Sequence, residues 1–217
     1  MYRASRRRLL SGNNARLRVI LLFASLLLFS GCGALLSGDV ETDLKALKQG
    51  NYTLDPHHTT VLFKVSHLGV SQFVGRFNHA TAELEYQPED PAASQIRASV
   101  NMRSLDVNRP DFADILKSCD WLCAERHPEA RFESKGRARQ SDNRLIFRGD
   151  LLFRGVTRPA ELYVTINGAT TNRLTGDYLI GFAAELSFKR SDFGLDKYIP
   201  AVGDQVAIEV YAEFVRR

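Results

Sequence analysis

Apolar and polar residues alternate along most of the chain beyond residue 51, and residues 145–166 show the pattern most clearly. This stretch, LIFRGDLLFRGVTRPAELYVTI, contains two runs with apolar side chains on every second position: Leu145, Phe147, Leu151, Phe153, Leu162, Val164 and Ile166. A period of two places one face of a strand against a core and the other toward water. Because the two runs meet at Arg154–Gly155, we predict an antiparallel hairpin with a tight, glycine-containing turn.

The same alternation predicts six further strands. They cover residues 52–67, 72–86, 95–105, 131–139, 178–188 and 206–214, and polar segments such as 87–93 and 168–176 separate them as turns. Between the third and fourth strands the period changes. Apolar residues in 111–123 follow helical spacing, with Pro110 at the first turn and Pro128 beyond the end. We therefore predict one short helix there.

Eight strands joined mostly by short connections predict an all-β fold. The expected architecture is an eight-stranded antiparallel up-and-down β-barrel with one short helical insertion between strands three and four. A sandwich of the same strands is the competing architecture. Closure is favoured because long strands leave long unpaired edges, which a barrel removes. A barrel of about eight strands has an interior that can hold one small ligand.

Strand order also predicts which connections share one rim. In an up-and-down barrel all odd-numbered strands end on the same side. This places His67, Arg109–Asp111, the segment to Cys123, the Gly155 turn and Arg190–Asp204 together. Long, chemically varied connections on a rigid scaffold usually present the binding site. We therefore expect the mouth of the barrel at that rim.

The first 31 residues have the composition of an export signal. Six arginines precede the apolar run 19–29, which is shorter than the roughly 20 residues that a membrane-spanning helix needs. Ser30–Gly31–Cys32 follows and resembles a bacterial lipobox, in which the cysteine is acylated (palmitate being one such acyl chain) and becomes the mature N-terminus. The alternative is ordinary signal cleavage nearby, which would leave the protein without an anchor.

These features define the expected organisation of the chain. Residues 1–31 are a lipoprotein signal peptide, residues 32–50 a tether and residues 51–217 the folded domain. The expected location is the periplasmic side of the bacterial cell envelope, with a lipid anchor at Cys32. The outer membrane is favoured over the inner one, because Gly33 and Ala34 lack the aspartate associated with inner-membrane retention.

The charge balance changes once the signal is set aside. The whole chain has 29 Lys and Arg against 25 Asp and Glu, a formal net charge of +4. Removing the 6 arginines of residues 1–31 leaves 23 basic and 25 acidic residues, a net charge of −2. The basic pI therefore belongs mostly to the export signal, and we expect no nucleic-acid partner.

Two cysteines remain if Cys32 carries lipid. Cys119 and Cys123 lie close together in the predicted helical segment. An oxidising compartment favours a disulfide between them, although in a regular helix the bond would require distortion. Free thiols and a CxxxC metal site are the alternatives. Two ligands without a His-rich partner segment are a weak metal signal, so we expect no metal.

Short motifs throughout the domain resemble the YceI-like family. They match its order and spacing over residues 51–215: Tyr52–His58, Phe63-x-Val65-x-His67-x-Gly69, Gly75-x-Phe77, Ser104–Asp106, Arg109 with Asp111, Leu116–Ser118, His127–Pro128 with Phe132, Gly149-x-Leu151, Gly155–Pro159, Gly181–Phe182, Arg190–Gly194 and Val202–Val206. Two features depart from the family. Pro110 separates Arg109 from Asp111, and Cys119 and Cys123 occupy a cap where cysteines are not typical.

The resemblance implies an elongated, lipocalin-like barrel that binds a polyisoprenoid or similar long-chain amphiphile, with an isoprenoid quinone as one candidate. It implies a binding or carrier protein of the periplasm, with no cofactor beyond the bound lipid. The expected partners are therefore a long-chain isoprenoid lipid and the membrane that the N-terminal anchor reaches. A homodimer is one open assembly.

Candidate ligand-binding residues fall into two groups. The apolar faces supply the expected cavity wall: Phe63, Val65, Leu84, Val100, Phe147, Phe153, Phe182, Phe188 and Phe214. The expected rim supplies polar groups suited to a phosphate or a quinone oxygen: His67, Arg109, Asp111, Arg190 and Asp192. The alternatives are a filled core for the first group, and ion pairs or turn caps for the second.

Enzymatic activity is not expected, and no catalytic residue is assigned. The sequence contains neither GxSxG nor HExxH, and its five histidines are scattered. Two alternatives to a lipid carrier stay open. One is a structural or partner-binding lipoprotein with a filled barrel, and the other is a thiol-dependent envelope enzyme built on Cys119 and His127.

Overall fold

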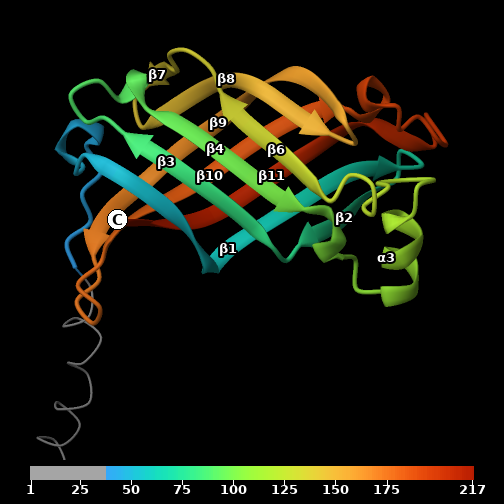
Figure 1. Cartoon of the computed structure of the whole chain (residues 1–217), viewed down its shortest axis with the longest axis horizontal. Coiled ribbons are helices and arrows are strands. Elements are labelled where there is room, and N and C mark those ends of the chain that lie inside the picture. The colour runs from blue at the N-terminus through green and yellow to red at the C-terminus, as the bar shows by residue number, and fades with distance from the viewer. Residues whose placement is uncertain (1–37) are drawn as a thin grey trace, which may run out of the picture.

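The computed structural model describes residues 38–217, so the predicted signal peptide and Cys32 lie outside the described residues. One antiparallel sheet closes on itself (Figure 1). Its strands are β1 (Gly50–His67), β2 (Ser71–Phe77), β3 (Ala80–Tyr86), β4 (Gln95–Asn101), β5 (Leu105–Asp106), β6 (Glu129–Ser134), β7 (Arg139–Ser141), β8 (Arg144–Phe153), β9 (Val156–Thr171), β10 (Tyr178–Lys189) and β11 (Val202–Arg216). Pairing of β1 with β11 completes the circuit β1-β3-β4-β6-β8-β9-β10-β11. The predicted eight-stranded antiparallel barrel is therefore confirmed.

Three of the predicted strands are interrupted. The run 72–86 divides into β2 and β3, which pair with different halves of the long strand β1. The run 95–105 divides into β4 and β5 around a 3-10 turn, and the run 131–139 into β6 and β7. Strand β1 also loses its register with β11 between Leu54 and Thr59. Pro56 lies within that bulge, where a residue without an N–H is tolerated.

The inserted helix is shorter than predicted. Helix α3 (Pro110–Lys117) begins where expected but ends before Ser118, whose backbone is extended. The N–H of Ser118 bonds to the carbonyls of Asp114 and Ile115, which closes the last turn. Cys119 and Cys123 are joined by a disulfide in the turns that follow, so the predicted helical spacing of 111–123 holds only for its first part.

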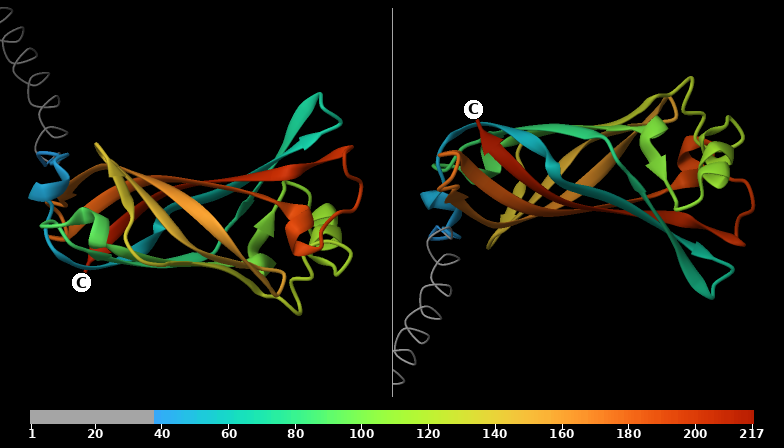
Figure 2. Two further views of the ribbon diagram at one scale, coloured as in Figure 1. Left: turned by 90° about the horizontal axis from the view of Figure 1, so that it is seen from above. Right: turned by 90° about the horizontal axis from the view of Figure 1, so that it is seen from below.

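The two ends of the barrel differ (Figure 2). The mouth end gathers the β1–β2 turn, the segment that contains α3, the β8–β9 turn and the β10–β11 connection, which agrees with the rim expected from strand order. The other end is closed by the residues that precede β1. Leu44, in the 3-10 helix Leu44–Ala46, is buried, as is Leu47, and Glu41 pairs with Ala169 of β9.

The packed structure therefore starts before Asn51. The described part of the expected tether, residues 38–50, packs against the barrel because its two leucines cover the apolar interior. Such a contact is tertiary and leaves no periodic signal in the sequence.

Two buried tyrosines organise this closed end. Tyr52 and Tyr86 are fully buried, and their rings meet edge to face at 6.5 Å. The Tyr86 hydroxyl donates to the carbonyl of Leu44 at 2.6 Å, and the Tyr52 hydroxyl donates to that of Lys48 at 2.5 Å. Burial raises the pKa of both phenols well above the usual value. The tyrosines thus fix the 44–48 segment over the barrel end.

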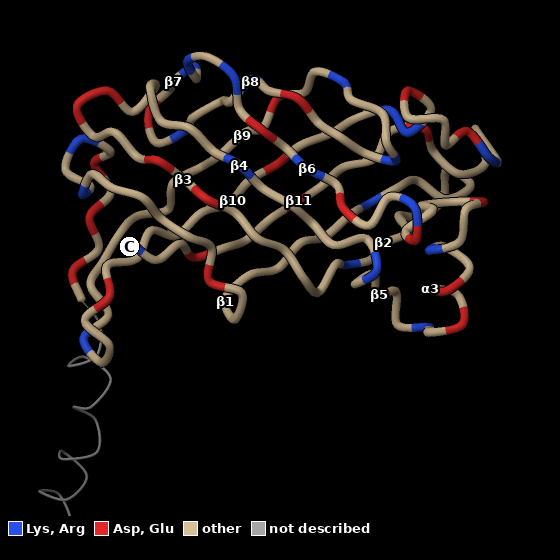
Figure 3. Tube along the Cα trace, in the orientation of Figure 1, with Lys and Arg blue, Asp and Glu red and all other residues tan. Residues whose placement is uncertain are grey.

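The outer surface carries mixed charge. Lys and Arg alternate with Asp and Glu over the barrel, without a block of one sign (Figure 3). Many of them are paired across strands, as Lys64 is with Glu209 and Arg97 with Glu133. Among residues 38–217, no helix is both long and apolar enough to cross a bilayer.

Candidate ligand-binding cavity

The barrel contains a cavity of about 680 Å³ that extends inward from the mouth. This volume lies within the range of small-molecule sites. Inward-facing residues of the barrel strands line it, together with residues of α3 and of the β10–β11 connection. The interior is therefore not filled throughout, as the filled-barrel alternative would require.

Small side chains create this space. Along β3 the inward residues grow from Ala80 and Ala82 to Leu84 and Tyr86 toward the closed end. Ala82 lies opposite Ala98 of β4, and Val100 lies between Ala80 and Ala130 of β6. Inward positions alternate with outward ones along a strand, so these alanines face the barrel interior and leave space there. Further toward the closed end, the larger side chains of Leu84 and Tyr86 fill the corresponding space.

The lining is mostly apolar. The polar residues that contribute to it at the mouth are His67, Ser71, Gln72, Arg190 and Tyr198, and those along the β3–β4–β6 wall are Thr81, Ser99 and Arg131. Arg131 is exposed and bonds to Glu129 at 2.7 Å. No Asp or Glu among the described residues lines the cavity. The site therefore suits an apolar chain with a neutral or anionic end at the mouth.

Arg190 is held by backbone oxygens. Arg190 is 2% exposed, and its guanidinium donates to the carbonyls of four residues of the β10–β11 connection and the start of β11: Leu195, Lys197, Val202 and Gly203. The distances lie between 2.8 and 3.0 Å. Burial lowers its pKa, while Asp204 and Asp196 oppose that shift. Arg190 therefore shapes the mouth, and most of its donors are already engaged.

An aromatic contact spans the mouth. Trp121 lies between the bridged cysteines and its ring meets that of Tyr198 at 6.0 Å. The adjacent Lys197 bonds to Asp120 at 3.0 Å, and this hydrogen bond raises the pKa of Lys197. Trp121 and Tyr198 both line the cavity. Two segments far apart in sequence thus meet across its entrance.

Nine of the fourteen predicted ligand-binding residues line the cavity: Phe63, Val65, His67, Val100, Phe153, Phe182, Phe188, Arg190 and Phe214. Leu84 and Phe147 face inward but are buried in the packed core beyond it. The alternation in the sequence correctly predicted that these two side chains face inward. It carries no information on how far along the barrel they lie.

Three predicted rim residues lie outside the cavity. Arg109 and Asp111 are exposed and bond to each other at 2.6 Å. This hydrogen bond lowers the pKa of Asp111 and raises that of Arg109. Asp192 is exposed in the 3-10 helix Arg190–Phe193. For these residues the structure agrees with the alternative of local ion pairs and turns.

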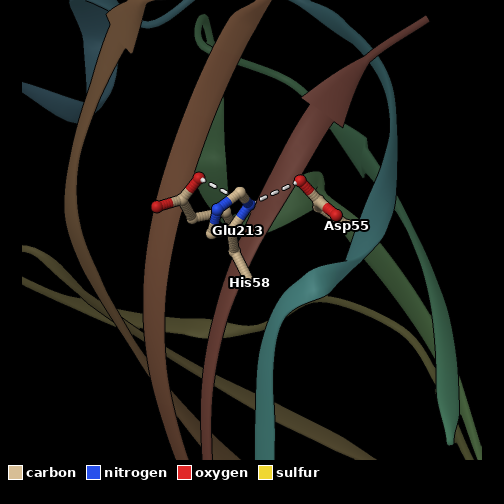
Figure 4. Close-up of side chains that lie close together, drawn as sticks. All are labelled: Asp55, His58 and Glu213. Atoms are coloured by element: carbon tan, nitrogen blue, oxygen red, sulfur yellow. Dashed lines mark hydrogen bonds and ion pairs between the residues drawn. The ribbon is translucent and has the colours of Figure 1, made fainter.

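A second polar cluster lies on the outside of the barrel, at the bulge in β1 (Figure 4). His58 Nδ1 is 2.8 Å from Asp55 and 3.9 Å from Glu213 of β11. The hydrogen bond to Asp55 raises the pKa of His58, and the same bond lowers that of Asp55. The three side chains place potential metal ligands within 4.8 Å of one another. In the structure they connect the bulge of β1 to β11.

Several lining residues were not predicted. The sequence did not single out Phe73, Phe112, Trp121 or Tyr198 as ligand-binding residues. The inward alanines Ala82 and Ala98 carried a usable signal, because small residues at inward positions of a strand leave space. The contact of Phe73 with Phe112 of α3, at 5.9 Å, depends on the tertiary fold.

A closed antiparallel barrel with an apolar cavity open at one end defines a ligand-binding β-barrel. The YceI-like domain family model matches residues 52–214. The chain therefore belongs to the YceI-like family.

The match to curated relatives covers most of the length of each relative. A UPF0312 protein of Shewanella baltica strain OS185 is 29% identical over 174 residues, which is 79% of this chain and 91% of the relative. A UPF0312 protein of Vibrio cholerae strain O395 is 30% identical over 174 residues, 79% of this chain and 90% of the relative.

Solved structures share the fold. BcnA of Burkholderia cenocepacia superposes with a TM-score of 0.66 at 21% identity, over 74% of this chain and 98% of that one. The YCEI protein of Campylobacter jejuni gives 0.62 at 22% identity, over 71% and 91%. A polyisoprenoid binding domain from Saccharophagus degradans gives 0.58 at 11% identity, over 78% and 100%.

Proposed function

We propose that the protein is a lipid-anchored carrier that holds a polyisoprenoid or similar long-chain amphiphile in its barrel, without catalysing a reaction. The observation that carries this proposal is the cavity of about 680 Å³, which is closed at one end, open at the other and almost entirely apolar. An isoprenoid quinone is one candidate ligand, because its ring carries neutral oxygens that suit the mouth.

The chemistry of the lining supports a long apolar chain. Each buried CH₂ contributes roughly 0.8 kcal/mol, so a chain of several isoprene units binds tightly without specific polar contacts. The mouth can accept a polar end through Ser71, Gln72 and His67, which border the cavity. A solved neighbour in this fold is described as a polyisoprenoid binding domain, which supports the same class of ligand.

The anchor forms the second part of the proposal. Acylation of Cys32 would hold the protein at the periplasmic face of a bacterial membrane, preferably the outer one. Mass spectrometry of the mature N-terminal peptide tests this part independently. An acylated Cys32 is expected, and an unmodified cysteine or cleavage elsewhere would overturn it while leaving the ligand proposal intact.

Organic extraction of the purified protein tests the ligand. Mass spectrometry of the extract should identify an isoprenoid lipid in near-stoichiometric amount. Ala98→Phe places a large side chain on the alanine-lined wall, and Ala183→Phe places the same side chain on the outer face of β10, opposite Tyr211 of β11. We expect at least about tenfold less lipid with Ala98→Phe, since the cavity volume that buries the chain is lost, and no change with Ala183→Phe. Recovery of no lipid from the parent protein, together with no uptake of added quinone or polyprenyl phosphate, would overturn the proposal.

A further inference from the structure

Exposed apolar side chains concentrate around the mouth. At the β1–β2 hairpin, Leu68 is 61%, Val70 84% and Val74 46% exposed. Ile199 and Tyr198 are exposed on the neighbouring β10–β11 connection, and Ile115 is exposed on α3. The N–H of Leu68 bonds to the carbonyl of Ala201 at 2.6 Å, so the hairpin and this connection lie side by side. Contiguous exposed apolar groups of this kind mark an interaction surface.

The turn of this hairpin holds a leucine in an unfavourable conformation. Leu68 has φ 55° and Gly69 φ 70°, which corresponds to a turn that favours asparagine or glycine at both positions. A non-glycine residue other than Asn or Asp rarely adopts this region. A leucine here is costly for the turn itself, which indicates that its exposed side chain has a use of its own.

The hairpin tip carries almost no charge. Residues 66–75, SHLGVSQFVG, contain no Lys, Arg, Asp or Glu. Several charged residues on the rest of the rim are paired locally, as Arg109 is with Asp111, Lys117 with Asp114 and Lys197 with Asp120. The tip can therefore enter an apolar phase without burying an unpaired charge.

The same hairpin also forms part of the cavity. Val65 and Phe73 face inward and line it, and Phe73 packs on Phe63 at 6.0 Å. Leu68 and Val70 lie beyond these residues at the turn, and the hairpin splays outward from the barrel at the mouth end (Figure 2). The inward face of the hairpin is thus part of the cavity wall, while the side chains at its tip are exposed to solvent.

We propose that the β1–β2 hairpin docks the mouth onto the surface of a lipid bilayer through Leu68 and Val70 at its tip, with Val74 on the outer face of β2 beside them. The projecting, uncharged tip fits the hydrocarbon boundary of a bilayer, whereas a protein partner would need a pocket to receive it. Docking would join the apolar cavity to the bilayer interior, so that a lipid could exchange without crossing water. This inference rests on the proposed function, because the exchanged lipid is the ligand of the cavity.

The residues that lead into the barrel lie at the end opposite the proposed docking surface. Residues 38–50 cover the closed end, opposite the hairpin (Figure 2). An acyl anchor at Cys32 would thus attach the closed end to one membrane and leave the mouth free to reach another lipid surface.

Vesicle flotation tests the docking surface. A truncated form that begins at residue 38 keeps every strand of the closed barrel and lacks Cys32, and circular dichroism and thermal melting verify its fold before the assay. This truncated form is mixed with phosphatidylethanolamine–phosphatidylglycerol vesicles. The double variant Leu68→Asn/Val70→Asn should lower the partition coefficient at least about tenfold, because two exposed apolar side chains are lost. Asparagine suits the positive φ at residue 68, so thermal stability should not fall.

Leu174→Asn is the matched control, because Leu174 is 77% exposed on the β9–β10 turn at the other end. It should float like the parent protein. If the parent does not bind vesicles, or if the double variant binds as well as the parent, docking is overturned. Uptake of a polyprenyl phosphate delivered from cyclodextrin separates the two proposals, because it needs no vesicle. The double variant should take up as much of this lipid as the parent protein does. If the parent protein takes up none, the proposed ligand is overturned, whatever the flotation result.

Discussion

The closed end and the mouth end of this barrel use the same strands for different purposes. At the closed end, inward positions are filled by large side chains such as Ile166 and Ile180, and tyrosine hydroxyls bond the covering segment in place. At the mouth end, inward alanines leave a cavity, and Arg190 donates hydrogen bonds to the backbone carbonyls of the rim. The packed end stabilises the fold, which allows the other end to keep an apolar space that costs stability.

A matched pair of isoleucines should separate the ends most strongly. Ile180 is fully buried at the closed end, whereas Ile208 borders the cavity. Ile180→Ala should lower the free energy of unfolding by about 4 kcal/mol, because it opens a new void in a close-packed region. Ile208→Ala should cost about 1 kcal/mol in the ligand-free protein, since its side chain already faces space. Urea unfolding of both variants measures the difference, and equal losses would mean that the two ends are packed alike.

Arg190 should be the main stabilising residue of the mouth. Arg190→Met leaves the carbonyls of Leu195, Lys197, Val202 and Gly203 without their donor, and we expect a loss of about 3 kcal/mol. Amide hydrogen exchange should accelerate in residues 195–203 and stay unchanged at the closed end. Arg158→Met, an exposed arginine of β9, is the control. Uniformly faster exchange over the whole barrel would contradict a local role.

Loss of the disulfide should lower stability only modestly but should change the rate at which a lipid passes the entrance. The Cys119–Cys123 bond closes a short loop, so replacing both cysteines with serine should cost about 2 kcal/mol. Because Trp121 lies within this loop and contacts Tyr198, its loosening should speed release of a bound lipid. Stopped-flow transfer to acceptor vesicles measures that rate. An unchanged release rate with the expected loss of stability would show that the Trp121–Tyr198 contact does not control the entrance.

The buried tyrosines predict alkaline sensitivity of the closed end. The pKa of Tyr86 is raised by burial, so above about pH 10 the unfolded chain releases a proton that the folded chain keeps. Stability is therefore fully present below that pH and falls as the pH rises toward the folded pKa. Tyr86→Phe should cost about 1 kcal/mol at neutral pH by leaving the Leu44 carbonyl unpaired, and it should reduce the steepness of the alkaline loss. Thermal melts between pH 8 and 11 test both effects, and a slope identical to that of the parent would contradict the assignment to Tyr86.

Local patterns predicted the strands well, because alternation within one segment reflects which face is buried. The barrel, its rim and the inward parity of Phe63 and Phe182 followed from that signal. Alternation carries no information on depth along the axis, so Phe147 was placed at the cavity although it lies in the packed core.

The remaining differences have tertiary causes. Leu44 and Leu47 become part of the core through contacts with strands far away in sequence. Helix α3 ends early at the turns that contain the disulfide. The sequence suggested that Arg109 was available for a ligand, but its guanidinium donates a hydrogen bond to the carboxylate of Asp111 two residues later.

Native mass spectrometry of a ligand titration tests the central claim most directly. The parent protein, Ala98→Phe and Ala183→Phe are mixed with a long-chain polyprenyl phosphate and the bound fraction is counted. The account predicts one ligand per barrel for the parent and for Ala183→Phe, and a dissociation constant at least about tenfold higher for Ala98→Phe, because the added ring occupies the space that the chain needs. Equal binding by all three proteins would contradict the claim, since it would place the ligand outside the barrel.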